Sequence, residues 1–151
     1  MLSQTRVLSV STPLATSLAA RDFSRFVKES PRRRVLVVDD EPLVRWSVAE
    51  TLGASGYEIV EAGDGDSAIR ALVDRRTPDV VLLDLCLPDS DDLRVLAVMR
   101  RLAPATPIIL MTAYATPELT EQAIKIGAFR VVGKPFEMNE LVPLIEDAFL
   151  H

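Results

Sequence analysis

Five side chains able to take part in catalysis follow short apolar runs of the sequence. Asp39 and Asp40 come directly after "VLVV", Asp84 ends "VVLLD", Thr112 ends "PIILMT", and Lys134 lies in "VVGKPF". Taken singly, each has an ordinary explanation, because Asp and Thr often cap the next helix and a Lys before Pro is commonly an exposed loop residue. Gathered at one edge, however, the carboxylates would repel by about 4 kcal/mol per close pair at an intermediate dielectric. A positive charge must therefore compensate them.

A divalent cation with oxygen ligands is the natural source of that charge. Mg²⁺ takes a few carboxylates and fills its other positions with waters and phosphoryl oxygens. Lys134 supplies a second positive charge, and Thr112 supplies a hydroxyl donor. A carboxylate nucleophile, a cation, an ammonium and a hydroxyl are together the parts that phosphoryl transfer requires.

The elements that must position these residues alternate between two kinds. Apolar, β-branched runs predict five strands, and apolar residues at helical spacing between them predict helices. That alternation indicates an α/β fold with a parallel sheet. In such a sheet ligands bind outside the carboxyl ends of the strands, where every candidate residue lies. The predicted strands are residues 35–39, 57–61, 80–84, 107–112 and 129–132.

Finer patterning ranks the strands and predicts the helix ends. Residues 35–39, 80–84 and 107–112 are continuously apolar before their polar ends, which is typical of central strands, whereas "YEIVE" alternates as an edge strand does. Pro143 falls inside the predicted last helix and favours a late start or a kink there. The predicted apolar stripes are Val44, Val48 and Leu52, then Ile69, Leu72 and Val73, then Leu93, Leu96 and Ala97; the predicted helix boundaries are Gly56, Thr77 with Pro78, Pro104, Thr116 with Pro117, and Gly127.

Length and charge bound the organisation of the chain. With 151 residues and 48% hydrophobic residues the sequence suits one domain, which we place at residues 32–151, after an N-terminal extension of residues 1–31. An export signal is the alternative for the extension, but Ser9, Ser11, Thr12 and Pro13 interrupt its apolar stretch. The net charge of −5 argues against a nucleic-acid partner, and no apolar run is long enough to cross a membrane. A single cysteine fits a reducing, cytoplasmic compartment.

Four motifs in order, "VVDDE", "LLDLCLPD", "MTAY" and "GKPF", carry a family resemblance. From about residue 33 to residue 150 the sequence resembles the receiver domain of two-component response regulators. The resemblance implies a flavodoxin-like (βα)5 three-layer sandwich with a five-stranded parallel sheet of order 2-1-3-4-5. It also implies that Asp84 is the phospho-acceptor, that Thr112 and Lys134 bind phosphoryl oxygens, and that the Lys134–Pro135 peptide is cis. Its implied Mg²⁺ ligands are Asp39, Asp40, Asp84 and the backbone carbonyl of Cys86.

The same resemblance implies partners and a role. The phosphoryl donor would be a histidine kinase or a histidine phosphotransfer protein, and the output would be contact with a downstream protein target. A phosphorylation-linked dimer is left as a further partner. We expect no enzyme activity beyond the domain's own phosphorylation and dephosphorylation. Because the sequence ends just after the fifth predicted helix, we expect a stand-alone receiver.

Two positions depart from the family pattern. Val131 stands where the family has an aromatic residue whose ring turns inward on phosphorylation, and Asp92 stands where glycine is common. Neither change touches the predicted pocket, so we predict that the chemistry is retained and the coupling to output is altered. Trp46 lies off the first helical stripe, and an exposed Trp is a candidate anchor for the phosphoryl donor, although packing against a loop is the simpler interpretation.

Two other functions compete with a phosphorylated receiver. One is a receiver-like binding module that no longer takes up phosphate. The other is a phosphatase resembling the haloacid dehalogenases, which share an Asp nucleophile, Mg²⁺ and a Lys but need a second acid two residues after the nucleophile. Cys86 occupies that position after Asp84, so the general acid for the leaving group is missing.

Overall fold

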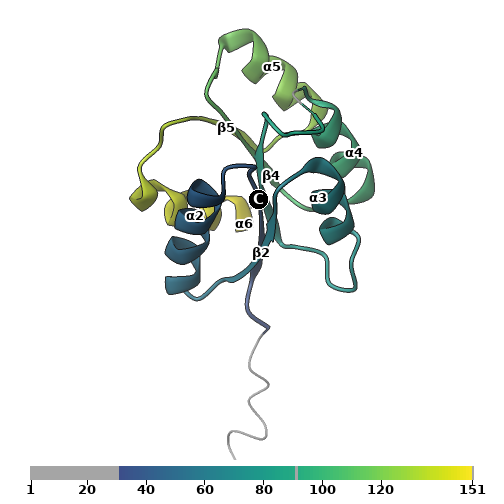
Figure 1. The fold of residues 1–151 in the computed structure, drawn as a ribbon. Coiled ribbons are helices and arrows are strands. Elements are labelled where there is room, and N and C mark those ends of the chain that lie inside the picture. The colour runs from purple at the N-terminus through teal and green to yellow at the C-terminus, as the bar shows by residue number, and fades with distance from the viewer. Residues whose placement is uncertain (1–30, 91, 151) are drawn as a thin grey trace, which may run out of the picture. The chain divides into compact units, whose positions relative to one another are not determined.

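The computed structural model describes residues 31–90 and 92–150, so the predictions for residues 1–30 lie outside the described residues. Strands and helices alternate along the chain (Figure 1). The strands are β1 (Arg34–Val38), β2 (Glu58–Ala62), β3 (Val80–Asp84), β4 (Ile108–Thr112) and β5 (Arg130–Gly133). The helices are α2 (Pro42–Ala54), α3 (Gly65–Leu72), α4 (Arg94–Leu102), α5 (Pro117–Ile126) and α6 (Leu141–Phe149), preceded by a 3₁₀ turn η1 (Met138–Glu140).

All strand pairings are parallel, and the sheet order is β2-β1-β3-β4-β5. The predicted fold class and strand order are therefore confirmed. β2 lies at one edge, as its alternating sequence predicted, while β3 is buried along its whole length at the centre. Parallel sheets need apolar cover on both faces, and the continuous apolar runs of β1, β3 and β4 meet that need.

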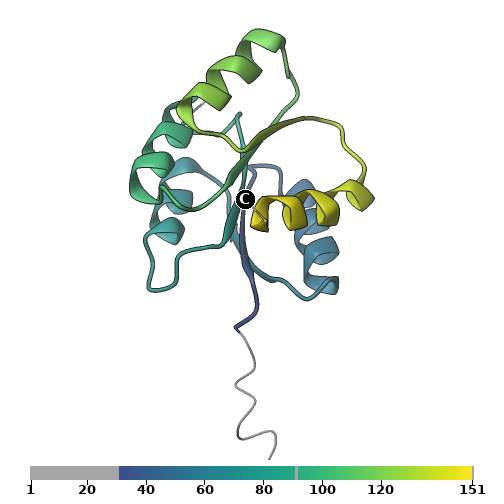
Figure 2. The ribbon, with the colours of Figure 1, turned by 180° about the vertical axis from the view of Figure 1, so that it is seen from behind.

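Helices cover both faces of the sheet and complete a three-layer sandwich (Figures 1 and 2). Successive residues of a strand point to opposite faces, so β1 contributes to two cores. Val35 and Val37 pack with α2 and α6, whereas Leu36 and Val38 pack with α3, α4 and α5. The predicted stripe residues Val48 and Leu52 are fully buried in the first core, and Leu72 and Leu96 are buried in the second.

Local sequence chemistry explains where α5 and α6 begin and end. The Thr116 side chain caps α5 by accepting a hydrogen bond from the Leu119 N–H at 3.2 Å, and Pro117 follows in the first turn. Gly127 closes the helix at φ +122°, a conformation that glycine adopts without a steric cost. The late start predicted from Pro143 is also confirmed, because α6 begins at Leu141 and leaves the proline in its first turn.

Two predictions of detail need correction. The second helix was expected to continue to Thr77 and Pro78, with Val73 on its buried stripe. Instead α3 ends at Leu72, and Val73 is 57% exposed. Helical periodicity had placed Val73 beside Leu72, but the chain leaves the helix there and turns the side chain to solvent.

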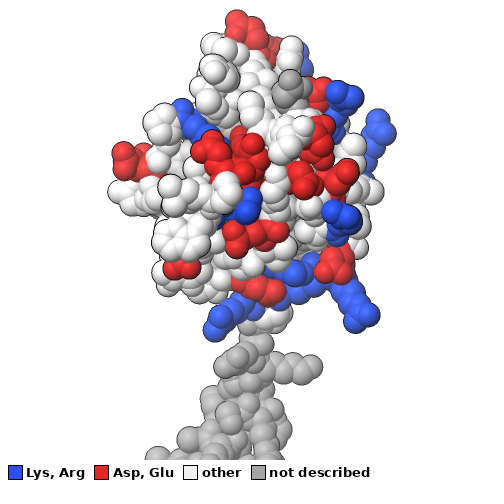
Figure 3. All heavy atoms as spheres, viewed as in Figure 1, with Lys and Arg blue, Asp and Glu red and all other residues white. Residues whose placement is uncertain are grey.

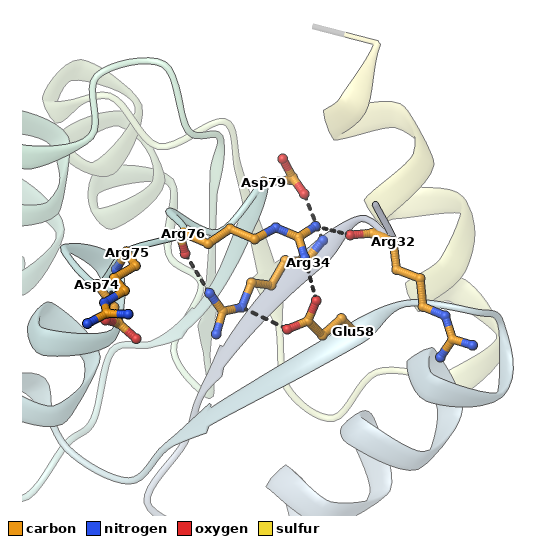
Figure 4. Close-up of polar contacts among 7 residues, drawn as sticks. All are labelled: Arg32, Arg34, Glu58, Asp74, Arg75, Arg76 and Asp79. Carbon is orange, nitrogen blue, oxygen red and sulfur yellow. Dashed lines mark hydrogen bonds and ion pairs between the residues drawn. The ribbon is translucent and has the colours of Figure 1, made fainter. Parts of the chain in front are cut away.

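A network of arginines and acids joins the amino-terminal ends of three strand segments (Figure 4). Arg34 on β1 pairs with Glu58 on β2 at 3.3 Å and donates a hydrogen bond to the carbonyl of Arg76 at 2.6 Å. Arg76 pairs with the same Glu58 at 2.6 Å, and the Arg34 N–H donates to Asp79 at 2.7 Å. The segment before β3 is thereby tied to both neighbouring strands. We call Arg34, Glu58, Arg76 and Asp79 the arginine network.

Among residues 31–90 and 92–150, no helix combines the length and the apolar character needed to cross a lipid bilayer.

Candidate functional site

The predicted site residues meet at the carboxyl-terminal edge of the sheet. Asp39 follows β1, while Asp84 and Thr112 are the last residues of β3 and β4. These three side chains are buried, with exposed fractions of 0%, 4% and 0% in that order. Asp40 is exposed beside Asp39. Buried acids are rare unless they are paired, so this edge has the composition of a binding site rather than of ordinary packing.

Lys134 supplies the pairing cation, and the cis peptide to Pro135 follows it as expected. Its ammonium nitrogen lies 2.7 Å from an oxygen of Asp39 and 3.4 Å from an oxygen of Asp84. The β4–β5 pairing carries Lys134 to this edge, because Thr112 pairs with Gly133 and the Lys134 N–H donates to the Thr112 carbonyl at 2.7 Å. One ammonium thus bridges the ends of β1 and β3.

The electrostatics of the site show that one ammonium does not balance the acids. Burial and the negative charge of Asp39 raise the pKa of Asp84 to about 6, although Lys134 and the Cys86 N–H oppose the rise. Burial alone would lower the pKa of the Lys134 ammonium, but the hydrogen bond and charge of Asp39, and then the charge of Asp84, raise it overall. Lys134 therefore stays charged, and the negative charge around Asp84 is only partly offset.

The acidic oxygens offer a place for a hard cation. Carboxylate oxygens of Asp39, Asp40 and Glu41 lie within 4.8 Å of one another. Oxygen donors with excess negative charge fit Mg²⁺ better than a soft metal. Glu41 takes part in this grouping although the sequence interpretation did not single it out, while the predicted ligand Asp84 is connected to Asp39 through Lys134. In Figure 3 acidic side chains gather near the middle of the viewed face, and most Lys and Arg lie along its lower edge and its right-hand side.

Backbone groups hold the remaining pocket side chains in place. The Thr112 hydroxyl oxygen accepts a hydrogen bond from the Tyr114 N–H at 3.1 Å, and Asp84 accepts one from the Cys86 N–H at 3.3 Å. Cys86 and Tyr114 are both exposed at the rim. The structure therefore brings the predicted site residues to one edge, with the Asp84 and Thr112 side chains buried and Cys86 and Tyr114 open to solvent.

Comparison with known proteins agrees with this geometry. Residues 35–146 match the family model of the response regulator receiver domain. The chain belongs to this family. The receiver domain of NtrX from Brucella abortus superposes with a TM-score of 0.71 at 36% identity, covering 77% of this chain and 98% of that one. The fold and the family therefore connect the chain with two-component signalling.

Curated relatives extend beyond the matched region. Transcriptional regulatory protein PdtaR of Mycobacterium tuberculosis is 40% identical over 117 residues, which are 76% of this chain and 55% of that protein. Regulatory protein AtoC of Escherichia coli is 40% identical over 115 residues, which are 76% of this chain and 25% of that protein. The chain thus spans between a quarter and about half of the length of these relatives.

The loop after Asp84 contains Asp92, one of the two departures from the receiver pattern, and its backbone is ordinary there. Asp92 does not adopt a positive φ, since no residue other than glycine does so within residues 31–90 and 92–150. Its carboxylate instead accepts hydrogen bonds from the Arg94 N–H at 2.9 Å and from Ser90 at 3.2 Å, at the start of α4. Asp89 accepts from the Gly65 N–H at 2.8 Å and so tethers the loop to α3. Asp92 thus holds the start of α4, whereas Asp89 holds the start of α3.

Two further residues of the receiver bear on output and docking. Val131 pairs with Leu110 in the sheet and packs, half-buried, against the core beneath α3, α4 and α5, so an aliphatic side chain fills the position discussed above. Trp46 is 58% exposed on α2, as its place off the stripe predicted, and Leu43 is 73% exposed one turn earlier. Sequence periodicity could identify both exposed residues, because neither shares a face with Val44 and Val48.

Proposed function

We propose that this receiver accepts a phosphoryl group on Asp84 from a phosphohistidine of a kinase or phosphotransfer protein. The observation that carries the proposal is the placement of Asp84, a buried carboxylate at the centre of the sheet edge, 3.4 Å from the Lys134 ammonium. A buried carboxylate beside a cation remains available as a nucleophile, and the exposed rim leaves it a route to the donor.

The transfer is a displacement at phosphorus. A carboxylate oxygen of Asp84 forms the new P–O bond while the P–N bond of the phosphohistidine breaks, and the departing imidazole keeps the electron pair and gains a proton from solvent. A carboxylate needs no general base for this attack. Lys134 moves its charge toward the equatorial phosphoryl oxygens, and the Thr112 hydroxyl donates to another of them. The Tyr114 N–H keeps the Thr112 oxygen in position for this bond.

Asp39, Asp40 and Asp84, with the backbone carbonyl of Cys86, would hold Mg²⁺. When bound, Mg²⁺ offsets the charge that the acids and the phosphoryl group bring together. The excess of acids over Lys134 and the raised pKa of Asp84 both support a cation at this edge. Glu41 is exposed next to Asp40, and its carboxylate adds to the negative charge of this edge.

A patch on α2 and the loop after β5 would receive the donor. Leu43 and Trp46 expose apolar surface on α2. A cavity of about 370 Å³ lies between the start of α2 and the loop after β5, lined by Glu41, Val44, Ala113, Lys134, Pro135, Phe136 and Met138. A histidine-bearing helix pair docked there would bring its phosphohistidine to the rim, with Trp46 as the aromatic anchor. Output would then follow through contact of the phosphorylated domain with a target protein.

Incubation with acetyl phosphate and MgCl₂, followed by intact-protein mass spectrometry, tests the proposal. Wild-type protein should gain one phosphoryl group, and Asp84→Asn should gain none. Asp74→Asn, which removes an exposed carboxylate elsewhere, is the matched control and should be labelled like the wild type. An Asp84→Asn protein that keeps the label would refute the assignment of the acceptor. A wild-type protein that takes up no phosphate would favour the binding module instead.

The phosphatase alternative has less support at this site. Cys86 is exposed at the position where that class needs its general acid, so the carboxyl group that would protonate the leaving group is missing there. Release of phosphate from exogenous phosphate esters, in amounts exceeding the protein, is the result that would revive it. We accordingly propose that the domain catalyses only its own phosphorylation and dephosphorylation.

A further inference from the structure

Arg45 lies beside the acidic edge but belongs to no part of the predicted pocket. It sits in the first turns of α2, and side chains on a helix incline toward the helix N-terminus. Its guanidinium therefore reaches back to the end of β1, where it donates a hydrogen bond to the main-chain carbonyl of Asp39 at 2.6 Å. The Arg45 side chain is only 22% exposed, so this bond is shielded from competing water.

Two neighbours fix the Arg45 side chain in that position. Its Nε lies 3.3 Å from an oxygen of Glu61 on β2, whose charge offsets that of the guanidinium. Gly63 leaves space on the other side, since a Cβ at this position would lie 3.1 Å from the guanidinium nitrogen. The guanidinium of Arg45, on α2, is thus held between the edge strand β2 and the residues that follow it.

The bonded carbonyl controls the next residue. It belongs to the planar peptide group that joins Asp39 to Asp40, so fixing its oxygen fixes the plane from which Asp40 projects. Asp40 is exposed, whereas Asp39 is already held by Lys134 and by the Glu41 N–H at 3.0 Å. Asp40 therefore depends on its backbone for its direction.

We propose that Arg45 is a positioning residue for the cation site, acting through the Asp39 carbonyl to orient Asp40, with Glu61 holding and neutralising the guanidinium. The inference rests on the proposed Mg²⁺-dependent function. For the Mg²⁺ affinity of a protein that lacks Arg45, the positioning role predicts a change opposite in sign to the one expected from charge alone. Removing a nearby positive charge should tighten cation binding by Coulomb attraction alone, whereas losing the positioning bond should weaken it.

Titration of MgCl₂ into the full chain, followed by backbone amide NMR shifts, measures this affinity without any phosphorylation. We expect Arg45→Met to bind Mg²⁺ about tenfold more weakly than the wild type, as loss of an outer-shell contact typically does. Arg101→Met, an exposed arginine on α4, is the control and should bind like the wild type. In chelator-treated protein, the Glu41 amide should exchange its hydrogen faster in Arg45→Met, because the turn it belongs to is less well held.

The possible outcomes separate the two proposals. If wild-type protein shows no Mg²⁺-dependent shifts, the proposed function fails. If wild type binds Mg²⁺ and Arg45→Met binds it equally or more tightly, the positioning role is overturned. Should Arg45→Met fail to fold, Glu61→Gln is the second variant, because Glu61 is half-exposed on β2. It should bind Mg²⁺ more weakly than the wild type even at high salt, where the loss of an exposed negative charge is screened, and wild-type affinity there would also overturn the proposal.

Discussion

The two ends of one sheet carry charged clusters of opposite design. In the arginine network the guanidinium groups of Arg34 and Arg76 both pair with Glu58, while Asp79 accepts a hydrogen bond from the Arg34 main-chain N–H (Figure 4). At the carboxyl-terminal edge Asp39 and Asp84 share the one ammonium of Lys134, and Asp40 lies exposed beside Asp39. The first cluster has two cations for two acids, whereas at the second Asp39, Asp40 and Asp84 outnumber the single ammonium. The two ends are therefore distinguished by whether positive and negative charges are equal in number, and not by how many charges each end carries.

Replacing Lys134 should give the largest change in the labelling rate. If it did not, the contrast between the two ends of the sheet would be wrong. In Lys134→Met the acids lose their ammonium, and the phosphoryl oxygens lose a charged partner, so acetyl phosphate labelling should slow by about 100-fold. Mass spectrometry against time measures the rate. Lys125→Met removes an exposed lysine paired with Glu121 on α5 and should leave the rate unchanged. Equal rates in both variants would show that Lys134 serves only the resting fold.

The arginine network should respond in stability alone. Arg34→Met removes a guanidinium that is 16% exposed and leaves Glu58 with fewer partners. We expect the free energy of unfolding in urea to fall by about 2 kcal/mol, with the labelling rate unchanged. Arg75→Met, an exposed neighbour, should change stability by less than about 0.5 kcal/mol. A labelling rate that fell with Arg34→Met would mean that the two ends are coupled.

Substitutions of Thr112 should separate the rate of phosphorylation from the structural change that follows it. A hydrogen bond to a charged group is worth about 1.5 kcal/mol, so Thr112→Ala should slow labelling roughly tenfold. NMR shifts induced by beryllofluoride should remain near Asp84 in this variant but no longer reach α5 and β5, because the hydroxyl connects β4 to the phosphoryl group. Thr112→Ser keeps the hydroxyl and should behave as the wild type. Undiminished shifts in α5 with Thr112→Ala would disprove the coupling.

The uncompensated charge on Asp84 should also affect stability through pH. Burial and Asp39 raise the pKa of Asp84 to about 6 from an ordinary 3.8. Between these values the folded chain holds a proton that the unfolded chain releases, so stability from this group is present below the lower value and is lost as pH rises through the upper one. Above pH 6, with a chelator present, Asp84→Asn should therefore be more stable than the wild type. We expect its free energy of unfolding to be higher by roughly 1 kcal/mol after solvent screening. Thermal unfolding across pH should show the difference vanishing toward the acid end.

The polar residues at the carboxyl ends of the strands could be predicted from the sequence, because local patterns show where each strand ends. Apolar runs and caps such as Thr116 identify strands and helices within a few residues, and polar residues that end parallel strands must share one edge. Arg45, by contrast, looked like an ordinary polar residue of an amphipathic helix. Its role depends on Glu61 and Gly63, which no local pattern connects to it. Val73 was misplaced for a related reason, since periodicity does not say where a helix stops.

By itself, the sequence determined the order of strands and helices, the α/β class and the set of acids, hydroxyl and lysine that gather at one edge. Hydrophobic periodicity and turn chemistry act over a few residues, so they can be read directly from neighbouring letters. Only the tertiary structure decided that Lys134 lies nearer to Asp39 than to Asp84, that Asp40 is exposed while its neighbour is buried, and that Arg45 turns back to the end of β1. These choices depend on register and packing between segments far apart in the chain, where a difference of one ångström decides which charges pair.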